Sequence, residues 1–182
     1  MLRALGSAHL LEEGLTAMNA MALLRTMHSE TKFRLKGILG SDQPAEAQQA
    51  WQALRPLLEL HEKLEDEYVY TALAEEFGAG SPLGDWAQRH DGDVAIVAQL
   101  IAEVDAAQPG TPEWRMALGR VADALTRHVT DEEGQIFGRI EQTWDAARLE
   151  SIGAEMQQVV EGAAAKQPVS RPAHAASARR RR

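Results

Sequence analysis

Three short runs of helix-breaking residues constrain the fold of this 182-residue chain more than any other feature of its sequence. They lie at 40–44, 78–84 and 108–112, where glycine and proline interrupt the chain. Between them, apolar residues recur at the 3.6-residue period of an amphipathic helix, as in Leu54, Leu57, Leu58, Leu60 and Leu64. No segment shows the alternating β-branched pattern of a strand. The sequence therefore predicts an all-α fold, an up-down-up-down four-helix bundle with short loops.

Local signals mark several helix ends. Thr111 and Pro112 place a capping residue before a proline at the first helical position, which predicts a fourth helix from Pro112 to about Ile140. Pro56 interrupts the second segment. It either kinks that helix or marks its true start, with 46–54 as a separate turn.

Three regions are expected along the chain. Residues 1–18 form an N-terminal extension, 19–165 form the bundle, and 166–182 form a disordered basic tail rich in proline, serine, alanine and arginine. The bundle includes an additional C-terminal helix, from Trp144 to about Ala165, that packs across the other four. The arginines at 179–182 are interpreted as a solubilising tail, with contact to a polyanion as the alternative.

Composition excludes several classes of site and partner. The chain has no cysteine, so disulfides, iron–sulfur clusters and cysteine-rich zinc sites are excluded, and any metal must be bound by histidine and carboxylates. The net charge is −8 even though the tail is basic, which argues against a nucleic-acid-binding core. No apolar run approaches the roughly 18 residues of a membrane span. Glu12 and Glu13 interrupt the apolar N-terminus, so we expect no secretory signal, no membrane partner and a cytoplasmic location.

Four of the six histidines fall one in each predicted bundle helix: His28, His61, His90 and His128. Two of them begin the same pattern, because Glu65 follows His61 and Glu132 follows His128 at a spacing of four residues. This spacing places both side chains on one helical face, and their neighbours on that face are apolar. We therefore expect all six side chains to point into the core, unlike His9 and His174 near the chain ends.

These buried polar residues indicate a metal cluster. A single histidine on an apolar face is usually a core residue that donates to a backbone carbonyl. Two glutamates at the same depth favour a different interpretation, because a buried carboxylate costs several kcal/mol unless it is paired or bound to metal. Four histidines and two glutamates suit iron, manganese or zinc, and carboxylates from two helices can bridge a pair of ions. A metal-free structural bundle is the alternative.

The depths of the four histidines match around the first and third connectors. Around the second connector, His61 and His90 differ by about nine residues, or about 13 Å of helix. The second helix must therefore overshoot the level of the site, and the segment 78–84 must return the chain to it.

The segments 61–70 and 128–137 resemble the two repeated His/Glu signatures of hemerythrin-like (HHE cation-binding) domains. The segments 19–28 and 89–91 resemble that family's first and third helices, so the resemblance extends over about 19–160. It implies a non-heme di-iron centre, in which Glu65 and Glu132 bridge two irons and the four core histidines are terminal ligands.

Two departures from the oxygen-carrying members of that family argue against oxygen transport. Those members have a second histidine one turn after the third-helix histidine, where this chain has Val94, and usually an aspartate where Glu132 stands. Asp93 is a possible substitute ligand, although its carboxylate would have to swing around the helix. Without one, the iron bound by His90 is short of protein ligands.

The resemblance and its departures leave two functions open. The first is a protein that binds or senses a small oxidant or diatomic ligand (O2, NO or peroxide) or iron itself. The alternative is a di-iron oxidase or peroxidase that removes hydrogen peroxide.

Several other polar residues lie near the predicted site. Tyr68, one turn beyond Glu65, can hydrogen-bond a ligand or a bound oxygen species, or can pack in the core with its hydroxyl at the edge. Lys32 is expected to extend to solvent. The remaining carboxylates are interpreted as solvated or as supports for the ligands, and they are Glu62, Asp66, Glu67, Asp131 and Glu133.

Overall fold

The computed structural model describes residues 18–166, and this part of the chain contains helices, short connections and no strand. The elements are α2 (Ala20–Leu39), α3 (Pro44–Glu65), η1 (Asp66–Tyr70), α4 (Thr71–Glu76), α5 (Pro82–Ala106), α6 (Pro112–Asp131), η2 (Glu132–Ile136), α7 (Phe137–Thr143) and α8 (Ala146–Lys166). The segments α3, η1 and α4 follow one another without a break, as do α6, η2 and α7. The described residues therefore form five long helices, which confirms the all-α prediction.

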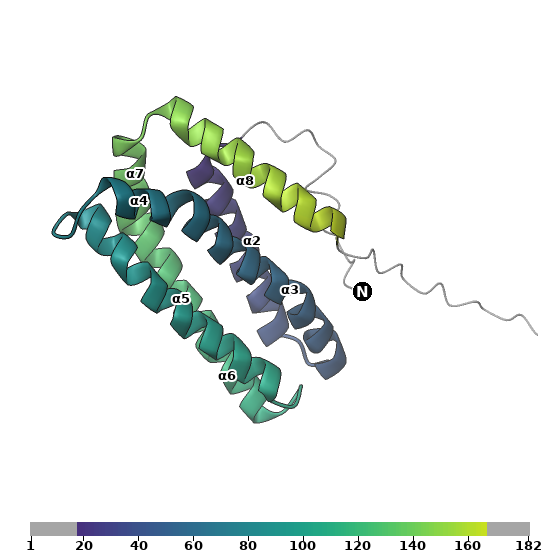
Figure 1. Ribbon diagram of the computed structural model, residues 1–182. Helices are drawn as coiled ribbons and strands as arrows, with labels where there is room; N and C mark the ends of the chain where they lie inside the picture. The colour runs from purple at the N-terminus through teal and green to yellow at the C-terminus, as the bar shows by residue number, and fades with distance from the viewer. Residues whose placement is uncertain (1–17, 167–182) are drawn as a thin grey trace, which may run out of the picture.

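The first four long helices pack as a bundle, and the fifth lies across it. Helix α2 packs against α3, α5 packs against α6, and α2 also contacts α6. Helix α8, coloured yellow-green in Figure 1, packs along α2. The predicted N-terminal extension and basic tail, with His9 and His174, lie outside the described residues, so those predictions stay open.

The helix starts follow from local chemistry. The side chains of Asn19, Ser81 and Thr111 each accept a hydrogen bond from the backbone N–H three residues later, which caps α2, α5 and α6. Helix α3 begins at Pro44, so Pro56 lies inside a helix that has already started. The alternative start at Pro56 is therefore wrong. None of the helices in the range 18–166 is both long and apolar enough to span a membrane.

Helix α8 approaches the start of α2 very closely. A Cβ atom built on Gly153 would lie 2.1 Å from the carbonyl oxygen of Met18 and 2.7 Å from the amide nitrogen of Ala20. Only glycine allows the two backbones to pack at this separation. Met156, fully buried one turn later, then anchors α8 to the rest of the core.

The apolar core is divided into two clusters. The α8 cluster includes Met21, Leu24, Leu64, Phe137, Ile140 and Met156. The distal cluster lies toward the other end of the bundle and includes Leu35, Leu54, Leu58, Val97, Trp114 and Leu118. On every bundle helix the buried histidine falls between residues of the two clusters, as His28 does between Leu24 and Leu35. A layer of buried polar side chains therefore separates the two halves of the core.

A π-helical turn lies at the glutamate of each of the two His/Glu patterns, beginning just after Glu65 and at Glu132. In η1 the N–H of Thr71 bonds to the carbonyl of Asp66, and in η2 the N–H of Phe137 bonds to the carbonyl of Glu132, five residues back in both cases. Such turns insert one extra residue into a helix and recur at functional sites. After η1 the helix continues to Glu76 before the chain returns through 77–81 to α5. The predicted overshoot of the second helix is thus confirmed.

Candidate metal centre

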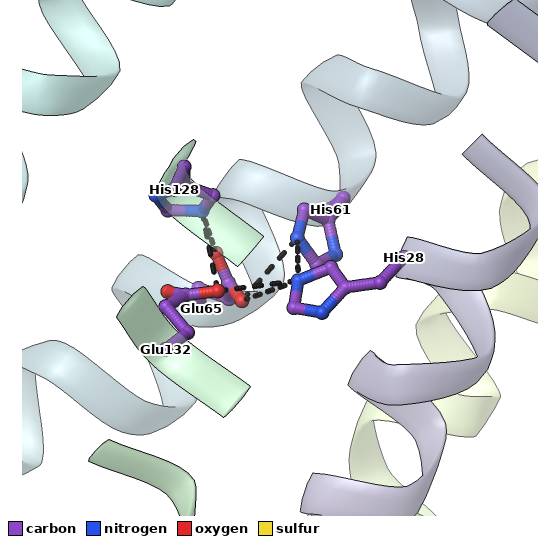
Figure 2. Close-up of side chains that lie close together, drawn as sticks. All are labelled: His28, His61, Glu65, His128 and Glu132. Atoms are coloured by element: carbon purple, nitrogen blue, oxygen red, sulfur yellow. Dashed lines mark hydrogen bonds and ion pairs between the residues drawn. The ribbon is translucent and has the colours of Figure 1, made fainter. Parts of the chain in front are cut away.

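Five buried side chains from three helices converge at the centre of the bundle (Figure 2). They are His28 from α2, His61 and Glu65 from α3, His128 from α6, and Glu132 at the start of η2. One potential ligand atom from each lies within 4.8 Å of all the others. The structure therefore brings together five of the six residues predicted to bind metal.

The contacts within this group have the spacing of atoms around a shared centre. His28 Nε2 lies 3.0 Å from His61 Nε2 and 3.2 Å from Glu132 Oε2. The two oxygens of Glu65 face different histidines, with Oε1 3.3 Å from His61 Nε2 and Oε2 3.5 Å from His128 Nε2. In Figure 2 the two carboxylates lie between His128 on one side and the other two imidazoles on the other.

The sixth predicted residue belongs to a second group that overlaps the first. His90 on α5 offers a ring nitrogen within 4.8 Å of carboxylate oxygens of Glu62 and Glu65. Glu65 is therefore common to both groups. Glu62 was interpreted from sequence as an outer carboxylate, but both of its oxygens are inaccessible to solvent and have no hydrogen-bond partner. The two groups contain seven residues in total.

The polar atoms of the first group fit a bound cation. Both oxygens of Glu65, Oε2 of Glu132 and Nε2 of His128 are buried without a hydrogen-bond partner. Buried polar atoms left unsatisfied destabilise a fold by about 1–3 kcal/mol each, and more when they are charged. A metal ion bound by these atoms removes that cost, and imidazole with carboxylate suits iron, manganese and zinc.

The pKa values show that the protein alone does not balance these charges. Burial raises the pKa of Glu65 well above its ordinary value, and the neighbouring Glu132 raises it further. Burial also raises the pKa of Glu62, to about 6. Burial lowers the pKa of His28, but its contacts with Glu132 and Glu65 outweigh that effect and raise the value to about 9. Burial also raises the pKa of Glu132, but its contacts with His28, His128 and Tyr70 outweigh that effect and lower the value to about 2. Glu65 and Glu62 are thus left with too little positive charge, which is the condition that a cation relieves.

Tyr70 is part of this centre, whereas Tyr68 is not. The Tyr70 hydroxyl donates to Glu132 Oε1 and accepts a hydrogen bond from Trp86 Nε1 at 3.0 Å. Its ring stacks on His90 with a centroid separation of 3.6 Å. Tyr68 is half-buried and packs against the α8 cluster, in agreement with the core-packing alternative. Because η1 adds one residue to the turn, Tyr70 rather than Tyr68 reaches the site.

A second set of contacts orients His28. Its Nδ1 donates to Glu133 Oε1 at 2.8 Å, so Nε2 faces the other ligands. Phe137 stacks against the same ring at a centroid distance of 5.6 Å. Arg25 lies over Phe137 and forms two hydrogen bonds with Glu141 at the surface. Of the two interpretations of Glu133 from sequence, this contact favours the support of His28.

The other flanking residues lie away from the site. Asp66, Glu67 and Lys32 are exposed, in agreement with their interpretation as solvated side chains. Asp93 is exposed and belongs to neither group. Its carboxylate therefore does not substitute for the histidine that oxygen-carrying family members have at the position of Val94.

Comparisons with known proteins agree with this geometry. The hemerythrin HHE cation binding domain matches residues 15–140, which include all seven residues of the two groups. A curated protein of Nostoc sp. (strain PCC 7120 / SAG 25.82 / UTEX 2576), named DNA nickase, is 23% identical over 140 residues. That match covers 77% of this chain but only 38% of the relative, so the chain spans well under half of its length. No solved structure matches significantly. Because the family match extends over most of the chain and contains its buried His/Glu cluster, this protein belongs to the hemerythrin HHE cation-binding domain family.

Proposed function

We propose that this protein is a non-heme di-iron protein that binds or senses a small oxidant or diatomic ligand (O2, NO or peroxide) or iron itself. The observation that carries the proposal is the overlap of two buried ligand groups at Glu65. A single ion would leave one group unsatisfied, whereas two ions sharing a carboxylate satisfy both.

The ligand set follows from the two groups. His28, His61, His90, His128, Glu65 and Glu132 are the six ligands that the family resemblance implies, and Glu62 is a seventh. Val94 carries no donor atom, and it lines the same surface groove as Glu62. Glu62 therefore takes the place of the histidine that is missing one turn after His90.

The two groups offer different numbers of donors. Five residues surround the first position, but only Glu62, Glu65 and His90 surround the second. Bound iron supplies a redox-active ion with an exchangeable coordination position. The protein holds that ion and excludes bulk water with the two apolar clusters above and below it. An added small ligand would bind beside Glu62, Glu65 and His90, where the protein offers fewer donors.

Iron content and ligand binding test this proposal. Protein loaded with Fe(II) under anaerobic conditions, oxidised and desalted should contain about two irons per chain by metal analysis. Azide, a small anion that binds ferric iron, should then produce a new visible absorption band that saturates. Retention of one zinc ion per chain after iron loading, with no azide band, would contradict the proposal.

The position of Tyr70 favours an oxidase or peroxidase as the second candidate function. Burial raises the pKa of Tyr70 well above its ordinary value, so its phenol keeps a proton beside Glu132. A proton held at this point can be donated to an oxygen atom of peroxide when an external electron donor supplies the two electrons that cleave the O–O bond.

Peroxide consumption distinguishes the two functions. If the protein is a peroxidase, the iron-loaded chain supplied with an organic electron donor should consume hydrogen peroxide catalytically, and Tyr70→Phe should slow it while Tyr68→Phe should not. If it is a binding protein, consumption should stop after about one equivalent of peroxide per site.

The DNA-nicking activity in the name of the Nostoc relative is not part of this proposal. The relative is only 23% identical, and most of its length lies outside the match. The net charge of −8 also opposes the approach of a polyanion.

A further inference from the structure

A groove between α3 and α5 runs from the surface toward the second ligand group. Its walls are mainly apolar and include Leu58 from α3 with Val94, Val97, Ala98 and Ile101 from α5. Glu62 also lines it, and Glu62 belongs to the ligand group that includes His90. The groove is therefore the surface feature that lies next to the second ion position.

The groove is larger than a diatomic ligand requires. Its volume is about 410 Å³, whereas a water molecule occupies about 30 Å³ of liquid. Sites for small organic molecules have volumes of about 300–1,000 Å³ and are lined mainly by apolar side chains. Both its size and its lining thus match an organic molecule rather than O2, NO or peroxide alone.

The charges at the outer end of the groove select against anions. Arg55 is the one basic residue that lines it, and its guanidinium is shared by Glu59 at 3.0 Å and Asp105 at 3.0 Å. Two carboxylates therefore surround one cation, and the rim carries a net negative charge. A carboxylate or phosphate group would find no unpaired cation among the lining residues.

We propose that this groove binds an organic molecule that has an apolar body and carries no negative charge. The apolar part lies against Leu58, Val97 and Ile101, and one end reaches Val94 and Glu62. The placement of that end beside an ion rests on the proposed function, whereas binding in the groove does not. In a sensing protein the molecule is a second ligand, and in a peroxidase it occupies the position of an organic co-substrate.

Two fluorescent probes with the same aromatic body test the binding. N-phenylnaphthylamine is uncharged, and anilinonaphthalene sulfonate adds one negative charge. The neutral probe should bind with saturable enhancement of its fluorescence, and the sulfonate should bind about tenfold more weakly because of the acidic rim. Equal binding of the two probes by the unmodified protein would overturn the inference.

A matched pair of variants locates the bound probe. Ala95 and Ala98 are both exposed on α5, but only Ala98 lines the groove. Ala98→Trp should abolish binding of the neutral probe, and Ala95→Trp should leave it unchanged, with circular dichroism confirming that both variants are folded. Undiminished binding by Ala98→Trp would show that the probe binds elsewhere and would overturn the inference.

The same samples separate this inference from the proposed function. Probe binding should be measured before and after the iron is removed with a chelator, together with the metal content. A protein that holds no iron but loses the probe on Ala98→Trp would contradict the di-iron proposal and leave the groove as a binding site. In the iron-loaded protein, saturating probe should slow azide binding at least about threefold. Unchanged azide binding would show that the bound molecule does not reach the second ion.

Discussion

The two His/Glu segments of the bundle, 61–70 and 128–137, have similar helical backbones but carry different side chains around the histidine and the glutamate. Each runs as an α-helix into a π-helical turn, which begins after Glu65 in the first segment and at Glu132 in the second. The residue after the histidine is Glu62 in the first segment and Val129 in the second. Five residues after the glutamate, the first segment has Tyr70 and the second has Phe137.

Because of these differences, the two segments contribute differently to the site. The first segment adds a buried carboxylate through Glu62 and a phenol through Tyr70, and both lie beside potential ligands. The second segment instead supports His28, which bonds to Glu133 and stacks on Phe137. The first segment therefore adds polar groups to the site, whereas the second segment orients the imidazole of His28. The comparison predicts that matched substitutions in the two segments have unequal effects.

The largest difference is expected between the two glutamates. Glu65 belongs to both ligand groups and Glu132 to one, so Glu65→Ala should lose almost all bound iron, whereas Glu132→Ala should keep about one ion per chain. Metal analysis of both variants, with circular dichroism to confirm helicity, measures the difference. Equal losses would instead support the symmetric bridging that the family resemblance implies.

A smaller loss is expected at the carboxylate found in only one segment. Glu62→Gln should reduce the iron content by about one ion per chain, because the second ligand group keeps only two donors. Glu67→Gln is the matched control, since that carboxylate is exposed and belongs to neither group. If the two variants contained the same amount of iron, Glu62 would not be a ligand.

Metal affinity should fall as the pH is lowered. Without an ion, His28 with a pKa of about 9 holds a proton near pH 7, and burial together with Glu132 raises the pKa of Glu65 and so favours its protonated form. A cation must displace those protons, so affinity should decrease by up to about tenfold per pH unit for each proton released. Titration of the metal-free protein with Mn(II), in buffers of different ionisation enthalpy, counts the protons. Binding that is independent of pH would show that these groups do not bind the ion.

The smallest effects are expected from exchanging the two aromatic residues. Tyr70→Phe leaves Glu132 Oε1 and Trp86 Nε1 without their partner, and should destabilise the metal-free protein by about 1–3 kcal/mol. Phe137→Tyr buries an extra hydroxyl in the α8 cluster and should destabilise it similarly. Chemical denaturation measures both changes. A neutral effect of Tyr70→Phe would show that its hydrogen bonds contribute little to stability.

The arrangement of the helices was predictable from sequence because its signals are local. Glycine and proline end the helices, capping residues start them, and the apolar period identifies their buried faces. The overshoot of the second helix followed from counting residues along it. Pro56 could not be assigned in this way, because proline fits both the interior of a kinked helix and its first turn. The residues from Pro44 to Leu54 are already helical in the structure, so Pro56 lies in the interior of α3.

The position of Tyr70 was not predictable from a regular helical period. An α-helix places residues three or four apart on one face, which led to Tyr68. A π-helical turn changes that phase by one residue, and single-sequence propensities do not indicate it. A signal did exist, because both segments carry an aromatic residue five positions after the glutamate. Alignment of the two segments with each other would have pointed to Tyr70.

Glu62 was missed for a different reason. It was grouped with the other carboxylates near the two signatures and interpreted as solvated or as a support for the ligands. It lies three residues before Glu65 and four after Leu58, so it shares a face with two buried side chains. The sequence did not indicate that α5 covers this face and shields Glu62 from solvent.

The polar layer between the two apolar clusters links the lifetime of the chain to its metal supply. No continuous hydrophobic contact joins the α8 cluster to the distal cluster among the described buried residues. In the absence of ions, unsatisfied buried oxygens of Glu62, Glu65 and Glu132 weaken the bundle at its midpoint, where helices would separate first and become open to proteases. Ions bound at the proposed site would satisfy these oxygens and stabilise the contact between the two halves. Protein that folds without metal would then be degraded faster, so its abundance in a cell would depend on the metal available when it folds.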